Sequence, residues 1–108
     1  MNEQKLKGML GLALRARQAA AGMEACRILV RSGQCGVLLM DGAAGDNTRR
    51  RCEQMCAGAG TPFRILPEGT IGEATGKSSF ILGIRIGSMA EQIVNILNSH
   101  QYGQYFCH

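Results

Sequence analysis

An uninterrupted apolar run between turn-forming residues is the feature that most constrains this fold. The run is Gly36-Val37-Leu38-Leu39-Met40-Asp41. A strand exposed on one side alternates apolar and polar residues, whereas a short run without this alternation is typical of a strand buried on both faces. Such a strand needs helices above and below the sheet, which predicts a fold of three layers.

Helical and extended patterns alternate along the rest of the chain, which indicates one α/β domain. Helices are expected over about 4–16, 23–32, 48–59, 70–75 and 88–97. Strands are expected over 17–21, 36–41, 63–66 and 80–86. Asp46-Asn47-Thr48 is expected to cap the third helix. The predicted fold class is α/β, a three-layer α/β/α sandwich around a sheet of about four strands.

The length of 108 residues allows one core of ordinary size. We therefore expect a single domain over residues 1–98 and a flexible C-terminal tail over 99–108, where no periodicity is found. No apolar run reaches the roughly 18 residues that a membrane span needs. The N-terminus leads into a helical pattern and not into a signal-peptide core, so a cytoplasmic location is expected.

Positive charge is concentrated in the first half of the chain. Residues 1–51 carry nine bases and four acids, a balance of +5, whereas residues 52–108 carry three bases and four acids, a balance of −1. A basic half on a cytosolic protein favours a polyanionic partner, of which RNA is the commonest, although a solvated basic face is the alternative.

The second predicted helix carries the better placed arginines. Ala25, Ile28, Leu29 and Ser32 fall on one of its faces, and Glu24, Arg27 and Arg31 fall on the opposite one. Arg27 and Arg31 share a direction that would follow a nucleic-acid backbone. The run Arg49-Arg50-Arg51 turns through about 200° of helical arc, so its members cannot all face one partner. A phosphate clamp and a solvated helix start are both open for this run.

Patterns that would indicate catalysis or a bound metal are weak. Gly72 and Gly76 are separated by three residues and not by the four of a phosphate-binding loop, and the segment leads from a helix to a strand. Cys52 and Cys56 lie four apart on a helix, where core packing is favoured over a shared metal ion. Both histidines fall in the last nine residues. We expect no enzyme activity, cofactor, metal or small-molecule substrate.

Several segments in a fixed order are similar to one family. They are 6–17 (LKGMLGLALRAR), 21–25 (AGMEA), 30–33 (VRSG), 46–52 (DNTRRRC), 61–63 (TPF) and 71–77 (IGEATGK). In order and spacing they resemble the bacterial YlxQ-type ribosomal proteins, of the kink-turn-binding superfamily of ribosomal proteins L-seven-Ae and L-thirty-e. The resemblance covers residues 5 to about 97 and implies an α/β/α sandwich with a mixed sheet that binds RNA without catalysis.

The resemblance also implies where RNA would be contacted. The places are Gly22 to Ile28 and Gly76 to Ser79, and the first suits phosphate because a helix N-terminus offers unpaired N–H groups. The kink-turn binders have a Gly-x-Asn-Glu-x-x-Lys pattern. Here Glu24 stands at the Asn position, Ala25 at the Glu position and Ile28 at the Lys position. These departures favour general RNA or ribosome binding over kink-turn recognition.

The resulting hypothesis is a non-catalytic, ribosome-associated or regulatory RNA-binding protein. Its partners would be ribosomal or other structured RNA, with ribosomal proteins as further candidates. The alternative is a protein-interaction module of the same fold that binds an acidic protein. The residues expected to contact RNA are Arg15, Arg17, Gly22, Glu24, Arg27, Arg31, Arg49 and Lys77.

Overall fold

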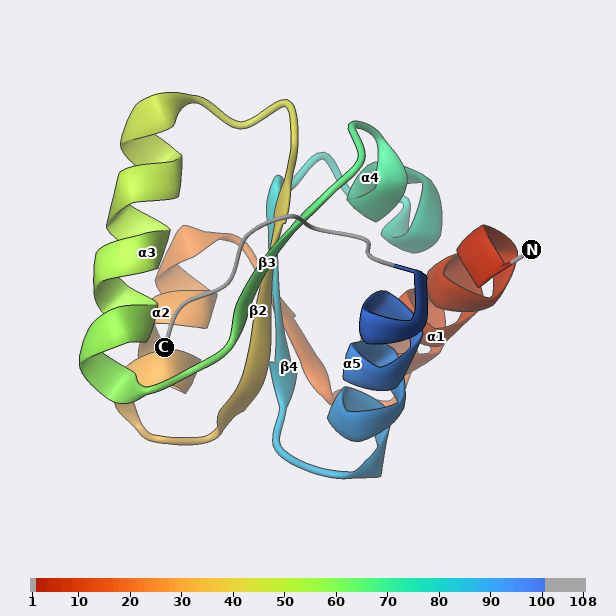
Figure 1. Cartoon of the computed structure of the whole chain (residues 1–108), viewed down its shortest axis with the longest axis horizontal. Helices are drawn as coiled ribbons and strands as arrows, with labels where there is room; N and C mark the ends of the chain where they lie inside the picture. Colours follow the sequence, from red (N-terminus) through yellow and green to blue (C-terminus); the bar gives the residue numbers. More distant parts are fainter. Residues whose placement is uncertain (1, 101–108) are drawn as a thin grey trace.

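A computed structural model describes residues 2–100 of the chain, with side chains for 3–98, and contains five helices and four strands (Figure 1). In chain order they are α1 (Asn2–Arg15), β1 (Ala19–Ala21), α2 (Met23–Arg31), β2 (Cys35–Asp41), α3 (Asp46–Ala59), β3 (Phe63–Leu66), α4 (Thr70–Thr75), β4 (Ile81–Arg85) and α5 (Ser88–His100). The predicted α/β/α sandwich is confirmed.

The sheet is mixed and has the strand order β1-β4-β2-β3. Strand β2 runs parallel to β3, and β4 runs antiparallel to both β1 and β2. Every residue of β2 except Gly36 is buried, as the apolar run predicted. The two central strands, β2 and β4, therefore carry the sheet between its two helical layers.

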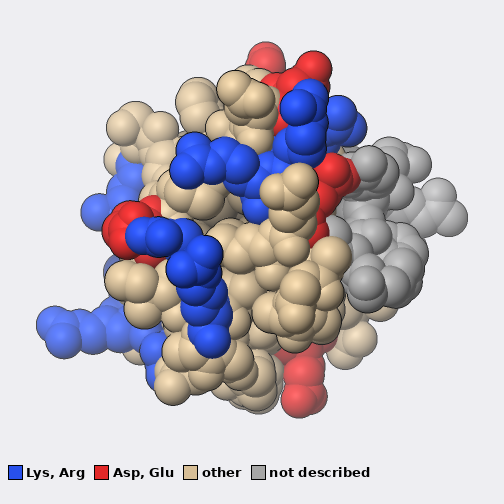
Figure 2. Space-filling model, turned by 90° about the vertical axis from the view of Figure 1, so that its left-hand side faces the viewer, with Lys and Arg blue, Asp and Glu red and all other residues tan. Residues whose placement is uncertain are grey.

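Helices α2 and α3 cover one face of the sheet, and α1, α4 and α5 lie on the other (Figure 1). The α2 and α3 layer is the side of the molecule that Figure 2 shows. Successive residues of β2 point to opposite faces: Leu38 and Met40 pack beneath α2 and α3, whereas Val37 and Leu39 pack beneath α1 and α5. The sheet thus separates two hydrophobic cores.

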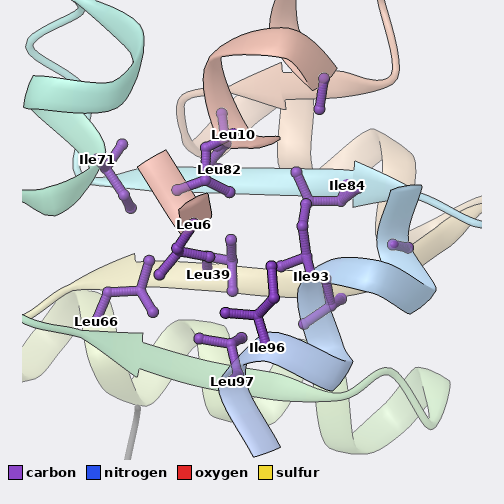
Figure 3. Packing of buried hydrophobic residues seen from close by; sticks show 13 residues of the cluster. Leu6, Leu10, Leu39, Leu66, Ile71, Leu82, Ile84, Ile93, Ile96 and Leu97 are labelled. Atoms are coloured by element: carbon purple, nitrogen blue, oxygen red, sulfur yellow. The ribbon is translucent and has the colours of Figure 1, made fainter. Parts of the chain in front are cut away.

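The core on the α1 and α5 side is built from aliphatic side chains (Figure 3). Leu6 and Leu10 of α1 meet Ile93 and Leu97 of α5 above the sheet, and Ile71 of α4 closes one side. The other core is rich in thiols, since Cys26, Cys35, Cys52 and Cys56 are all buried in it. The interpretation of Cys52 and Cys56 as core residues agrees with this packing.

Helix α2 is rotated from the orientation that its sequence suggested. Its buried residues are Cys26, Leu29 and Val30, whereas Ile28 is 61% exposed. The grouping of Ile28 with Leu29 on one packed face was therefore wrong. A reason lies at the start of the helix, where the Cys26 thiol reaches the Ala20 carbonyl oxygen at 3.2 Å and so turns position 26 toward the sheet.

Two helix ends also differ from the sequence expectation. The N-cap of α3 is Gly45, with no side-chain cap hydrogen bond, and Asp46 lies in the first turn instead. An acidic residue there is favourable because it faces the positive end of the helix dipole. Helix α5 continues through His100, two residues into the predicted tail, and the rest of that tail, 101–108, lies outside the described residues. Among the described helices, none is long and apolar enough to cross a membrane.

Two glycines of α1 give a matched test of the packing between α1 and α4. A Cβ on Gly11 would lie 2.8 Å from the Ala74 carbonyl oxygen, whereas a Cβ on Gly8 would meet nothing within 4 Å. Gly8→Ala should raise the free energy of unfolding by about 0.5–1 kcal/mol, because Ala loses less backbone entropy in a helix. Gly11→Ala should lower it by about 1 kcal/mol or more through overpacking. Urea unfolding followed by circular dichroism measures both, and equal stabilisation by the two changes would contradict the close approach.

Candidate nucleic-acid interface

One end of the sheet joins segments that are far apart in the sequence. Strand β1 ends at Ala21 beside Leu82, and the next N–H, that of Gly22, donates to the Ile81 carbonyl oxygen at 3.0 Å. The Asp41 N–H donates to the Phe80 carbonyl oxygen at 2.8 Å. We call this region, formed by Gly22 and the loops 42–45 and 76–80, the loop end. It brings together the two places where the family resemblance predicts RNA contact.

The N-terminus of α2 opens at the loop end. Gly22 is its N-cap, with φ of 96°, a conformation that side chains other than glycine rarely adopt, and it offers no side-chain acceptor. The first N–H groups of a helix have no partner within the helix, so they attract anions. Glu24 stands in this first turn and forms an ion pair with Arg27. The local charge at the helix start is therefore close to neutral.

The loop 76–80 is held by short-range hydrogen bonds. Gly76 ends α4 in the left-handed region with φ of 71°, and the Lys77 N–H donates to Thr75 Oγ1 at 3.2 Å. The Ser79 hydroxyl donates to the Ile81 carbonyl oxygen at 3.0 Å. This ordered turn presents the exposed Lys77 and leaves Phe80 52% exposed.

A buried carboxylate, Asp41, fixes the neighbouring loops. Its Oδ1 accepts from the Ala43 N–H at 2.8 Å, and its Oδ2 accepts from the Gly69 N–H at 2.9 Å. Asp41 is only 2% exposed, so these two backbone donors satisfy carboxylate oxygens that burial would otherwise leave unpaired. Sequence reasoning treated Asp41 as a strand end and missed this role. Its position directly after the apolar run was the available indication.

A groove of about 640 Å³ lies between α2 and α3. Its basic lining residues are Arg27, Arg31 and Arg51, and no acidic residue lines it. Figure 2 shows Lys and Arg side chains gathered across this face. Arg31 and Arg51 are exposed, and within residues 2–100 neither takes part in an ion pair. Sequence reasoning chose Arg49 from the arginine run, but Arg49 pairs with Asp46 at 3.6 Å, and Arg51 is the member that faces α2.

The remaining predicted contacts lie elsewhere. Arg15 lines a separate groove between α1 and α4, together with Lys7, which pairs with Glu73. Arg17 lies in the turn before β1, where the Arg85 N–H donates to the neighbouring Gln18 carbonyl oxygen at 2.8 Å, at the end of the sheet opposite Gly22. The basic side chains of the first half of the chain therefore do not share one flank of the molecule. They divide between the two outer faces because α1 and α2 cover opposite sides of the sheet.

Cys26 and Cys35 are poor nucleophiles at neutral pH. Burial raises the pKa of the Cys26 thiol to about 12, and the nearby Cys35 adds to this rise. Burial also raises the pKa of Cys35 to about 11. Within residues 2–100, no group of three His, Cys, Asp or Glu side chains is placed to hold a metal ion.

Comparison with known proteins gives a fold without a family assignment. No protein-family model matches the sequence, and none of the curated proteins is significantly similar to it. A solved structure of a protein of unknown function from Bacillus halodurans is similar with a TM-score of 0.81 at 25% identity, over 87% of this chain and 97% of the other. A 15.5 kD RNA-binding protein from Giardia lamblia is similar with a TM-score of 0.71 at 12% identity, over 91% of this chain and 86% of the other. At that identity the second likeness concerns the fold alone.

The buried thiols give a direct test of whether a reactive cysteine is present. The pKa of about 11 leaves Cys35 roughly a hundredfold less thiolate at neutral pH than its ordinary value of 9.0 would. In a Cys107→Ser variant, we expect labelling of the four thiols at pH 7.5 to be at least about a hundredfold slower in the native protein than in urea. Mass spectrometry of the labelled peptides identifies each thiol. Native labelling of any one of the four at the unfolded rate would point to a reactive site.

Proposed function

We propose that this protein is a cytoplasmic, non-catalytic RNA-binding protein that associates with the ribosome. It contacts structured RNA through the loop end and through the face of α2 that carries Arg27 and Arg31. The observation that carries the proposal is the hydrogen bond from Gly22 to Ile81 at 3.0 Å. That bond holds Gly22, the N-cap of α2, beside Ile81, which directly follows the loop 76–80 with its exposed Lys77. The helix start and Lys77 are proposed to contact the same RNA.

Two likenesses support this function. The Giardia lamblia RNA-binding protein has the same fold over most of both chains. The ordered motifs from residue 5 to about 97 resemble the YlxQ-type proteins of the kink-turn-binding superfamily. We assign the chain to that superfamily as part of the proposal. The ribosome is the expected location because the motifs are those of the ribosomal branch.

The contact we propose is made mainly to phosphates and not to base edges. Glu24 and Ile28, which stand at the Asn and Lys positions of the family pattern, are both exposed on α2. A glutamate accepts hydrogen bonds but repels phosphate. The isoleucine side chain has no polar group, so it can hydrogen-bond neither to a base edge nor to a phosphate. Affinity then depends on the remaining cations, which position RNA without specifying its sequence.

The exposed Ile28 favours one alternative, a protein-interaction module. An apolar side chain that is 61% exposed, next to basic residues, suits an amphipathic acidic partner. Capture of partners from a lysate with and without ribonuclease separates the two functions. A ribosomal or other partner held only through RNA is lost on digestion, whereas a direct protein contact survives.

Salt dependence tests the proposed RNA contact. With about four phosphate contacts, the logarithm of affinity for structured RNA should fall with the logarithm of salt concentration at a slope of about −3 to −4. Lys77→Ala should weaken binding and make the slope shallower by about 1, because one counterion fewer is released. Lys5→Ala, an equal loss of charge on the exposed side of α1, is the matched control and should change little. A slope near zero for the unchanged protein would contradict RNA binding.

A further inference from the structure

The groove between α2 and α3 has the size of a small-ligand site. Its volume of about 640 Å³ falls within the range of roughly 300–1,000 Å³ that is usual for such sites. Both helices begin at the loop end, so the groove runs from Met23, directly after Gly22, down to Arg31, Gly58 and Ala59. An RNA strand that leaves the loop end along α2 would enter this groove without crossing another helix or strand of the protein.

The rim of the groove is suited to phosphate. Arg31 on α2 and Arg51 on α3 stand on its two sides, are exposed, and form no ion pair within the described part of the chain. Arg27 also lines it but is engaged by Glu24. The planar guanidinium group binds phosphate oxygens in pairs, and no carboxylate lines the groove to compete for it.

The floor of the groove is apolar and small. It is formed by Met23, Val30 and Met55, with Val30 almost fully buried. Thioether side chains are polarizable and pack well against flat aromatic rings. Gly58 lines the groove without a side chain, and the space beside it is open, since a Cβ at that position would meet nothing within 4 Å. An apolar floor of three side chains beneath a cationic rim fits one nucleobase with its phosphate.

From this juxtaposition we propose that the α2 and α3 groove is a binding site for a single nucleotide unit. Arg31 and Arg51 hold its phosphate, and its base lies on the methionine floor. The unit comes either from a strand of RNA bound at the loop end or from a free nucleotide, and the first source rests on the proposed function. An acidic peptide fits less well, because its carboxylates would meet the arginines but no ring would cover the floor.

The first experiment uses the amide chemical shifts of the full chain to test whether ligands bind in the groove. Adenosine monophosphate, inorganic phosphate, adenosine and a single-stranded oligoribonucleotide are titrated separately. The nucleotide should shift the amides of Arg31, Arg51 and Gly58 and bind more tightly than phosphate or adenosine alone. The oligoribonucleotide should shift these amides and those of 76–80 as well. Shifts confined to the loop end with every ligand would overturn the proposal.

The second experiment separates the contribution of the arginine charges to nucleotide binding from the contribution of the groove's shape. Arg31→Ala with Arg51→Ala should weaken nucleotide binding at least tenfold, whereas Lys5→Ala with Arg85→Ala, an equal charge loss at exposed positions outside the groove, should leave it within twofold. Gly58→Leu should occlude the groove without altering charge, whereas Gly58→Ala leaves room in it. Both changes improve helix propensity, and thermal unfolding verifies the fold.

The two proposals fail in different ways. RNA binding that responds to Lys77→Ala but not to Gly58→Leu or to loss of Arg31 and Arg51 removes the groove site and leaves the proposed function intact. Nucleotide binding in the groove without measurable RNA binding leaves the groove site, with a free nucleotide as its ligand, and removes the proposed function. Equal competition by a polyglutamate peptide would overturn the nucleotide assignment, since charge alone would then explain the groove.

Discussion

Burial of β2 on both faces is the constraint on which the rest of this structure depends. Leu38 and Met40 require cover from α2 and α3, and Val37 and Leu39 require it from α1 and α5. The helices must therefore divide between two layers, and their cations divide with them. The molecule extends 33 × 26 × 26 Å, so charges on its two outer faces are separated by more than two Debye lengths of about 8 Å at physiological ionic strength. Only the α2 and α3 share of the basic residues can act on a ligand of that face.

The sequence was sufficient where a pattern had one physical solution. The apolar run at 36–41 and the short helix Thr70–Thr75 both appear as expected. Helix α2 has nine residues and two competing apolar stripes, one through Ile28 and one through Cys26. Periodicity cannot choose between them in so short a helix. The thiol contact of Cys26 with Ala20 is a tertiary interaction that helical spacing does not contain.

The sequence indicated individual residues of the candidate site, but it did not indicate how they are arranged in space. The family resemblance named both Gly22 and the loop from Gly76, yet their proximity follows from the antiparallel pairing of β1 with β4. The arginine run posed a similar problem, because a helical arc of about 200° leaves each member facing a different way. Only the packing of α3 beside α2 places Arg51 at the groove and Arg49 beside Asp46. Such choices depend on contacts between elements, which local patterns do not record.

The pair between Glu24 and Arg27 determines where phosphate would bind along α2. An exposed ion pair is worth about 0–1 kcal/mol, so a phosphate can displace Glu24 from Arg27 at little cost. The freed carboxylate would then stand beside the phosphate and repel it, which offsets the gain at the helix start. One turn further along, Arg31 has no such competitor among the described residues, and Arg51 faces it across the groove. An anion therefore meets less competition between the two helices than at the start of α2, where Lys77 of the loop 76–80 has to supply the positive charge.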